Sequence, residues 1–165
     1  MLKHEYARGA LKEGLRHQKN LKVNPYKFGM IGSTDSHNSL VTPEEDNFFG
    51  KFVESEPSPD RTKTKLAGGR LWENWKISAS GYAAVWAAEN TRDALFAAIK
   101  RKEVYATTGS RIRVRFFGGW DFSQTTLDVP NFEELAYKIG VPMGGDLSGH
   151  DGTAPGFIFS AFRDP

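Results

Sequence analysis

The chain has 165 residues, a formal net charge of +2, and 39% hydrophobic and 13% aromatic residues, which predicts a folded domain rather than a disordered segment. Lysine and arginine are interspersed with aspartate and glutamate and form no long basic run, which argues against nucleic acid and anionic membranes as partners. The sequence contains no cysteine, and this excludes disulfides, thiolate zinc sites and cysteine nucleophiles.

The sequence carries no signal for export or membrane insertion. Residues 1–5 are polar and lack the apolar segment of a secretion signal. No apolar run approaches the roughly 20 residues that cross a bilayer. We therefore expect a soluble chain, which suits a parent protein in the cytoplasm or in the periplasm.

The N-terminal part of the sequence predicts a helix followed by a strand. Apolar residues recur at helical spacing over residues 2–20, which predicts an amphipathic helix. Asn24-Pro25 ends this pattern, because a residue that precedes proline avoids the helical conformation. The apolar stretch 26–31 then predicts a buried strand that ends at residues 32–34. A helix followed by a buried strand is half of an α/β repeat.

Residues 39–70 are polar and irregular, and proline and glycine interrupt them repeatedly. A connection of about 30 residues is long for a compact domain. Two interpretations remain open. The segment is either a functional loop or lid, or an insertion that is disordered and has no role.

The middle of the chain predicts a second strand and helix. Residues 82–87 form an apolar run typical of a buried strand. Asn90 or Thr91 can cap the helix predicted over residues 92–102, which has an acidic residue in its first turn and three basic residues at its end. Residues 104–109 then predict a strand or turn.

Residues 111–117 alternate between apolar side chains and arginines, and this period of two predicts a strand with one face turned to the core. Three apolar residues would face the core: Ile112, Val114 and Phe116. Three arginines would line the opposite face: Arg111, Arg113 and Arg115. A row of cations can also contact nucleic acid, but the neighbouring sequence adds few positive charges, so we interpret the arginines as a solvated face.

The rest of the sequence predicts mainly strands, over residues 143–147 and 156–162, with one helical turn over 131–137. The character of the sequence therefore changes near residue 110. We expect residues 1–110 to form an α/β domain and residues 111–165 to form a small, incomplete, mostly β segment.

The strongest candidate for chemistry is Asp35-x-His37, directly after the strand predicted over residues 26–31. Residues two apart in a strand point to the same side, so the carboxylate and the imidazole would lie together. Such a pair suits one divalent ion, or supplies one ligand to each of two adjacent ions. The alternative is a turn in which Asp35 caps a loop and His37 is an ordinary surface residue, and the spacing alone leaves both open.

A second candidate is the stretch 105–111, which combines three serine and threonine hydroxyl groups, a glycine and an arginine. These groups can hold an anionic oxygen, because a guanidinium contacts phosphate through two hydrogen bonds. The alternative is a turn at a sheet edge whose hydroxyl groups are solvated.

Residues 32–37 resemble the last metal-binding motif of the polymerase-and-histidinol-phosphatase (PHP) metallohydrolases. The resemblance is closer to one branch of them, known as domain of unknown function 3604. It extends in order through four further stretches: 23–29, 85–92, 105–112 and 141–147. A resemblance over most of the chain is much more specific than Asp-x-His alone.

The resemblance implies both a fold and a chemistry. The implied fold is α/β, with residues 1–110 as the C-terminal part of a distorted, TIM-like β/α barrel. The implied chemistry is hydrolysis of a phosphoester or related bond in a small anionic substrate, by water that two or three divalent ions activate. The ions would be zinc, manganese or iron, and Asp35 and His37 would be their ligands.

Further site residues follow from the same resemblance, which places residues 105–111 near the barrel mouth. Three residues are expected to bind substrate: Thr107, Ser110 and Arg111. Three residues are expected to support the ligands from behind: Ser33, Thr34 and Glu89. Glu89 also has two other readings, as a further ligand or as an ordinary carboxylate at a helix end. No residue is assigned the role of catalytic acid or base.

The sequence also departs from the family's pattern, because the His-x-His motif and the acidic and histidine motifs that follow it are missing. The other histidines form no ligand-like pair, and we expect them at the surface: His4, His17 and His150. Two ligands do not complete the shell of even one catalytic ion. We therefore expect a middle or C-terminal fragment of a longer enzyme that is inactive, or nearly so, alone. The alternatives are a non-catalytic binding or structural module, and a homo-oligomer in which two chains complete each other's sites.

Overall fold

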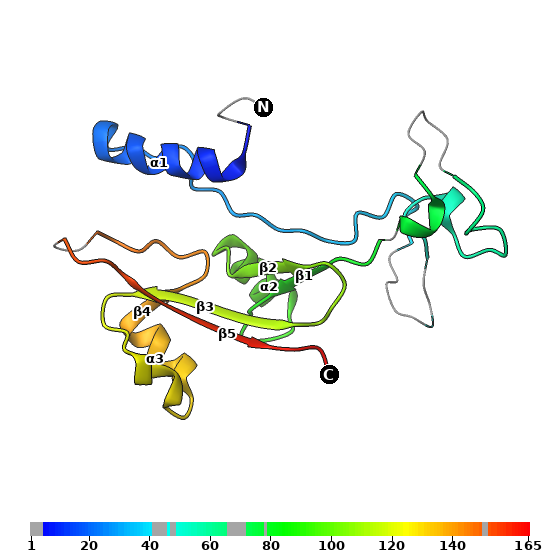
Figure 1. The fold of residues 1–165 in the computed structure, drawn as a ribbon. Helices are drawn as coiled ribbons and strands as arrows, with labels where there is room; N and C mark the ends of the chain where they lie inside the picture. Colours follow the sequence, from blue (N-terminus) through cyan, green and yellow to red (C-terminus); the bar gives the residue numbers. More distant parts are fainter. Residues whose placement is uncertain (1–4, 41–45, 47–48, 66–71, 78, 150–151) are drawn as a thin grey trace. The chain divides into compact units, whose positions relative to one another are not determined.

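The computed structural model describes residues 5–40, 46, 49–65, 72–77, 79–149 and 152–165. The chain forms two compact units, Met1–Met30 and Ile31–Pro165. The described elements are three α-helices and two small antiparallel sheets (Figure 1). Three short 3-10 helices join them: η2 (Val53–Ser55), η3 (Asn74–Lys76) and η4 (Gln124–Asp128). Within the described residues, no helix is both long enough and apolar enough to cross a membrane.

The first unit contains helix α1, Ala7–Leu21, which confirms the helix predicted over residues 2–20. The helix ends at Lys22, whose backbone is left-handed at φ 63° and whose N–H closes the last turn. The side chain of Asn24 folds back onto the helix, where a Cβ at Gly14 would lie 2.3 Å from its Oδ1. The side chain of Asn24 therefore packs against the helix after the chain has left it.

The apolar stretch 26–31 is not a strand, and this prediction is wrong. Residues 27–36 carry no regular secondary structure, and Met30 and Ile31 are exposed. A strand needs a neighbour that pairs with its backbone. Both sheets of the described chain are built from residues 82–162 alone. The candidate Asp35 therefore follows an extended loop, not a buried strand.

The first sheet pairs β1, Tyr82–Val85, with β2, Val104–Thr107, and helix α2, Arg92–Lys100, connects them. These elements confirm the predicted helix and the strands on either side of it. Thr91 caps the helix, because its side-chain oxygen accepts a hydrogen bond from the N–H of Ala94 at 3.3 Å. The cap and the basic end of α2 are both local signals that the sequence carries.

The expected TIM-like β/α barrel is wrong. Such a barrel is built from parallel strands, each followed by a helix. All strand pairs in the described chain are antiparallel, with Val85 opposite Val104 in the first sheet. The sheets have two and three strands and neither of them closes. The fold is a mixed α/β arrangement without a barrel. The division expected near residue 110 stays a prediction.

The second sheet places β3, Arg113–Gly119, between β4, Gly140–Pro142, and β5, Gly156–Phe162. Strand β5 confirms the strand predicted over residues 156–162. The strand predicted over residues 143–147 is wrong, since these residues form the turn and loop that follow β4. Glycine suits this turn, and the sequence between β4 and β5 therefore belongs to a connection rather than to the sheet.

Helix α3, Phe132–Ile139, follows η4 and confirms the helical turn predicted over residues 131–137. It covers the core of the second sheet, where Phe117 and Ala136 are fully or almost fully buried. The rings of Phe117 and Tyr137 meet edge to face at 5.1 Å between centroids. This aromatic pair joins α3 to β3.

The residues of β3 that face the core are not the ones that the alternating pattern predicts. Phe116, expected to face the core, is 39% exposed, whereas Phe117 is 1% exposed. Arg115, expected on the solvated face, is half-buried, with its guanidinium carbon 3.3 Å from the centroid of the Trp86 ring. A planar cation stacked on an aromatic face is tolerated inside a protein when an anion is near.

That anion is Glu103, whose side chain is 6% exposed just before β2. One oxygen of Glu103 accepts a hydrogen bond from the Tyr137 hydroxyl and lies 3.8 Å from Arg115, while the other lies 3.4 Å from Arg101. Arg115 also donates to the Tyr137 hydroxyl at 2.9 Å. Burial and the neighbouring Glu103 carboxylate raise the pKa of Tyr137, so the phenol stays protonated and donates.

The long segment predicted as a loop over residues 39–70 contains η2 in its described part. Asn74, which follows this segment in the sequence, is hydrogen-bonded to it. The buried side-chain amide of Asn74 donates to the carbonyl of Glu54 and to the hydroxyl of Thr64, both at 2.8 Å. A buried amide with two such bonds fixes its partners in place. The residues around η2 therefore form an ordered local structure.

Candidate metal site

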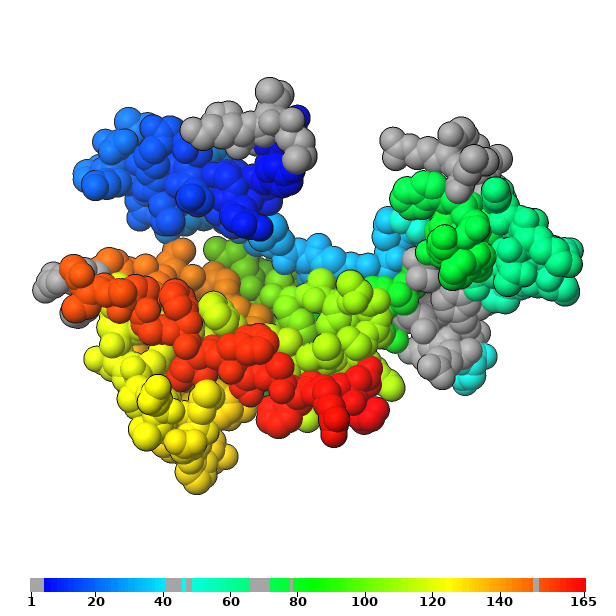
Figure 2. Space-filling view, viewed as in Figure 1, coloured from blue at the N-terminus to red at the C-terminus, as the bar shows by residue number. Residues whose placement is uncertain are grey.

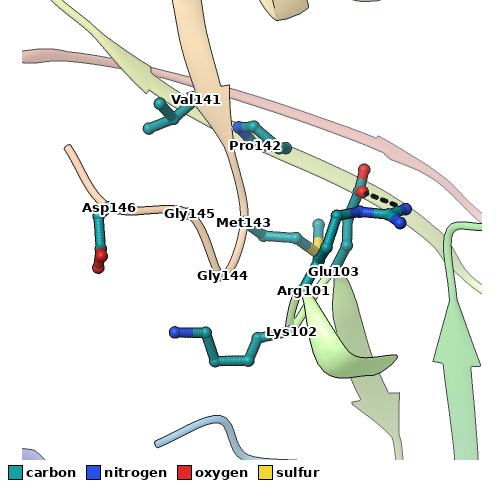
Figure 3. A pocket seen from close by; sticks show the side chains of 9 residues that line it. All are labelled: Arg101, Lys102, Glu103, Val141, Pro142, Met143, Gly144, Gly145 and Asp146. Carbon is teal, nitrogen blue, oxygen red and sulfur yellow. Dashed lines mark hydrogen bonds and ion pairs between the residues drawn. The ribbon is translucent and has the colours of Figure 1, made fainter. Parts of the chain in front are cut away.

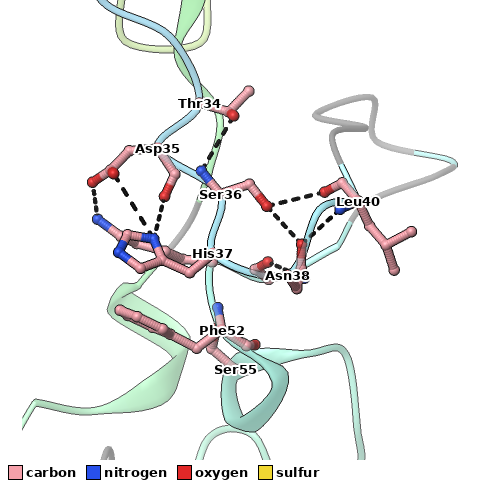
Figure 4. Close-up of polar contacts among 10 residues, drawn as sticks. Thr34, Asp35, Ser36, His37, Asn38, Leu40, Phe52 and Ser55 are labelled. Carbon is pink, nitrogen blue, oxygen red and sulfur yellow. Dashed lines mark hydrogen bonds and ion pairs between the residues drawn. The ribbon is translucent and has the colours of Figure 1, made fainter.

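Asp35 and His37 lie on the same side of the loop that precedes η2 (Figure 4). His37 Nδ1 is 3.8 Å from Asp35 Oδ1, and the two side chains are 47% and 69% exposed. The backbone of Asp35 is left-handed, with φ 56°. Aspartate tolerates this conformation better than most residues do. The two groups therefore meet across a tight turn, not along a strand as expected.

The hydrogen bond of the His37 ring determines which of its nitrogens carries a lone pair. His37 Nδ1 lies 2.7 Å from the carbonyl oxygen of Asp35. A carbonyl only accepts, so Nδ1 carries the hydrogen in this contact. In neutral imidazole the lone pair is then on Nε2, which is the arrangement by which a backbone carbonyl orients a metal-binding histidine. The ring of Phe52 supports the imidazole at 4.6 Å between centroids.

Lys51 is the third charged group at this turn. Its ammonium donates to Asp35 Oδ2, and its carbonyl accepts from the backbone N–H of His37 at 2.8 Å. The Lys51 hydrogen bond lowers the pKa of Asp35, with smaller electrostatic contributions from Lys51 and His37. The Asp35 carboxylate is therefore ionised at neutral pH, as a metal ligand must be.

A network of hydrogen bonds clamps the loop onto the segment around η2. The side-chain amide of Asn38 donates to the carbonyl of Gly50 at 2.9 Å and to Glu56. The other Glu56 oxygen accepts the N–H of Gly50 at 3.0 Å. Ser36 donates to Asn38 Oδ1 at 2.6 Å, which orients the amide (Figure 4). The clamp fixes the distance between the Asp35 turn and Lys51.

Glycine lets the loop approach the first sheet. A Cβ at Gly32 would lie 3.1 Å from the Cβ of Ala106 in β2, and a Cβ at Gly81 would lie 2.4 Å from the carbonyl oxygen of Ser33. The loop before Asp35 therefore lies against β2 and against the residue that precedes β1.

The residues expected behind the ligands have different surroundings. The buried Thr34 accepts the N–H of Ser36 at 3.3 Å, which shapes the turn. Ser33 is exposed and contributes its backbone to the contact with Gly81. Glu89 is exposed in the turn before α2, and within the described chain it has no hydrogen bond or ion pair to Asp35 or His37.

The expected substrate-binding turn is ordered by its own groups. The Thr107 hydroxyl donates to the carbonyl of Ser110 at 2.5 Å and accepts the N–H of Gly109 at 3.4 Å. Arg111 is paired with Asp164, through its backbone N–H at 2.7 Å and its side-chain Nε at 3.5 Å. Its side chain nevertheless remains 70% exposed.

Gly81 brings the two candidate segments together. The position of a Cβ at Gly81 would be 2.4 Å from the Ser33 carbonyl oxygen and 3.2 Å from that of Thr107. The backbone two residues before Asp35 and the turn that begins at Thr107 therefore border the same glycine. The sequence separates these segments by more than 70 residues, and the fold makes them neighbours.

Of the remaining histidines, only His17 lies among the described residues. His17 lies in α1, where its ring is 6.2 Å from that of Tyr26. His4 and His150 fall outside the described residues. Among the residues that the structure describes, no group of three or more histidine, aspartate and glutamate side chains is placed to hold a metal ion.

A separate cavity of about 370 Å³ lies between the end of α2 and the turn after β4. Its lining combines cationic and anionic side chains, with Lys102 and Asp146 on either side of the glycine turn (Figure 3). Gly144 is left-handed at φ 81°, and a Cβ there would lie 2.1 Å from the carbonyl oxygen of Lys102. Close backbone contact therefore explains this glycine without any ligand.

Sequence reasoning missed Lys51 and the clamp formed by Asn38, Gly50 and Glu56. Asn38 contacts residues 12 and 18 positions away across an irregular segment. No periodic pattern marks such contacts in a sequence. The available signal was indirect, since a long ordered loop after a candidate motif often contributes residues to the same site.

The geometry defines a mixed α/β protein with one acidic side chain and one histidine side chain converging on an exposed turn. Comparison with protein families identifies where it belongs. The pattern of the family described as "Protein of unknown function (DUF3604)" matches residues 1–165, so the chain belongs to that family. No curated protein and no solved structure shows a significant match.

Proposed function

We propose that this chain contributes Asp35 and His37 to the divalent-metal centre of a hydrolase that cleaves a phosphoester or related bond. The observation that carries the proposal is the placement of an ionised carboxylate and an imidazole on one side of the same turn, where the protonated His37 Nδ1 lies 3.8 Å from Asp35 Oδ1 and leaves Nε2 as the nitrogen with a lone pair. The likeness of residues 32–37 to the last metal-binding motif of the PHP metallohydrolases supports it. The DUF3604 family, to which the chain belongs, is described as of unknown function, so the proposal depends on this likeness and on the geometry.

The donor groups suit zinc, manganese or iron. An ionised carboxylate and an imidazole nitrogen are ligands that all three metals accept. The depressed pKa of Asp35 keeps its carboxylate ionised, and the hydrogen bond from Nδ1 leaves the lone pair of neutral His37 on Nε2. Two protein ligands do not complete a coordination shell, so waters and further protein groups would supply the rest. When bound, the ion would supply activated water for attack on the ester.

The chain's other residues have supporting roles in this proposal. Thr34 and the clamp around Asn38 hold the turn that presents Asp35 and His37. The turn of Thr107 and Ser110, which borders the same glycine as Ser33, would face an anionic group of the substrate. The exposed guanidinium of Arg111 would pair with that group after leaving Asp164.

An alternative function is a binding or structural module without catalysis. One observation favours it: Asp35 already has a cationic partner in Lys51, so the described turn satisfies its own charge without an ion. In this alternative, the acidic residue and the histidine would stabilise the loop, and metal would bind no more tightly here than at other exposed side chains.

Calorimetric titration with zinc and with manganese distinguishes the two functions. We expect the wild-type chain to bind one ion weakly, and a double variant Asp35→Ala, His37→Ala to lose at least ten-fold in affinity, because both protein ligands are removed. A matched control replaces an exposed carboxylate and a histidine elsewhere, Asp60→Ala with His17→Ala. Equal affinity of wild type and the double variant would exclude the metal function.

We also propose that the chain self-associates, which would let two copies complete each other's metal sites. Strand β5 is an edge strand with no charged residue, and its Phe157 and Phe159 are 59% and 60% exposed. It lies at the visible surface, in red in Figure 2. An uncharged edge strand can pair with a second copy. We expect light scattering to show a dimer at high protein concentration. A monomer at every concentration, with and without manganese, would contradict this.

A further inference from the structure

We propose that Lys51 competes with the metal ion for Asp35. Its ammonium neutralises the Asp35 carboxylate in the metal-free chain and lowers the affinity of that carboxylate for a divalent ion. This inference rests on the proposed metal function and adds a determinant of metal affinity to it. The starting observation is the hydrogen-bonded ion pair between Lys51 Nζ and Asp35 Oδ2.

Lys51 differs from an ordinary surface lysine in its burial and in its neighbours. Its side chain is 22% exposed, whereas that of Asp35 is 69% exposed. The lysine therefore approaches the carboxylate from the protein side and leaves the solvent side of Asp35 open. The ammonium also lies 5.7 Å from the centroid of the Phe52 ring, the same ring that supports His37.

Hydrogen bonds hold the backbone of Lys51 and of the residue before it. Its own carbonyl accepts the N–H of His37 at 2.8 Å. The preceding residue, Gly50, is held through its carbonyl by Asn38 at 2.9 Å and through its N–H by Glu56 at 3.0 Å. The fold thus keeps the Cα of Lys51 close to Asp35, within reach of its ammonium.

A metal ion and the Lys51 ammonium compete for the same negative charge. Oδ2 of Asp35 already carries the Lys51 ammonium, so an ion that binds the Asp35 carboxylate would share it with a cation. Two positive groups on one carboxylate repel each other, and the ammonium withdraws charge from the oxygen that should bind the ion. Ion binding is therefore weaker with Lys51 in place than without it.

The test compares zinc affinity in four forms of the full chain: wild type, Lys51→Met, Lys51→Gln and Lys51→Arg. Methionine keeps an unbranched apolar stem beside Phe52, glutamine keeps a neutral donor, and arginine keeps the charge. We expect the two neutral variants to bind zinc roughly five-fold more tightly, the scale of one exposed charge pair. Lys51→Arg should bind no more tightly than wild type. The control Lys63→Met removes a lysine paired with Asp60 and should leave the affinity unchanged.

The outcomes separate this inference from the metal function itself. If the neutral variants bind zinc as tightly as wild type, or less tightly, while Asp35→Asn loses binding, the competitor role is wrong and the metal function stands. If wild type, Asp35→Asn and the Lys51 variants all bind alike, the metal function fails and the competitor role fails with it. Backbone amide spectra recorded without zinc show whether the turn keeps its structure. Tighter binding in both neutral variants supports the inference.

Discussion

Replacing Arg115 with methionine is expected to lower the free energy of unfolding by about 3 kcal/mol, the lower end of the cost of breaking a buried ion pair. The change leaves Glu103, 6% exposed, with Tyr137 and the more exposed Arg101 as its partners. It also removes the guanidinium that stacks on Trp86, while methionine preserves most of the apolar stem. Urea unfolding followed by tryptophan fluorescence measures the loss.

A control and a second variant isolate the buried charge as the cause. Arg113→Met removes an exposed arginine from the same strand and should cost less than about 1 kcal/mol. Combining Arg115→Met with Glu103→Gln should recover part of the stability, because a neutral amide still accepts the Tyr137 hydrogen bond. Equal losses for the Arg115 and Arg113 variants would show that the Glu103 network does not stabilise the fold.

Replacing Gly50 with alanine is expected to open the clamp at the candidate metal site, at a cost of about 2 kcal/mol for local overpacking. A Cβ at Gly50 would lie 2.2 Å from the carbonyl oxygen of Ser55. Ser55 is fully buried, and its hydroxyl both accepts from and donates to the backbone of Phe52. The backbone therefore has no room to retreat, and residue 50 must move away from Asn38 and Glu56.

Hydrogen exchange of the His37 amide reports that movement, because this N–H donates to the carbonyl of Lys51. A cost of about 2 kcal/mol corresponds to roughly thirty-fold faster exchange when exchange follows local opening. Gly149→Ala is the matched control, since a Cβ there meets nothing within 4 Å. Unchanged exchange of the His37 amide in Gly50→Ala would mean that the clamp does not hold the turn.

The elements that the sequence predicts well are those with local signals. Helix α2 begins at Thr91, whose cap needs a neighbour only three residues away, and ends in basic residues. Strand β5 is confirmed because its apolar run is short and bounded by glycine and proline. Such signals depend on neighbours in the chain, so they can be read without knowing the fold.

The failures come from partners that lie far away in the sequence. The stretch 26–31 has the composition of a strand, but a strand forms only where another one pairs with it. The prediction for β3 put all arginines outside, yet Arg115 points inward because Trp86 and Glu103 receive it. The parallel barrel was inferred from likeness and from α/β order, whereas β1 and β2 pair in antiparallel register.

The candidate site shows the same division. The sequence predicts that Asp35 and His37 lie close together because it predicts a strand there. The structure places them close together through a tight turn instead. A strand would align residues two apart. Here the backbone of Asp35 is left-handed, and a hydrogen bond from His37 Nδ1 to the carbonyl of Asp35 holds the imidazole beside that residue. Lys51 reaches the same carboxylate from 16 residues away, and nothing local in the sequence indicates this contact.

The central claim is that Asp35, through its carboxylate, and His37, through Nε2, supply ligands to one divalent-metal centre, and nitrogen-15 spectra of the histidine rings test it most directly. During zinc titration of the wild-type chain, we expect the Nε2 signal of His37 to move while Nδ1 remains protonated, and Asp35→Asn to weaken that response at least ten-fold. His17 should not respond. A His37 ring that ignores zinc, or one that responds equally with and without the Asp35 carboxylate, would contradict the account.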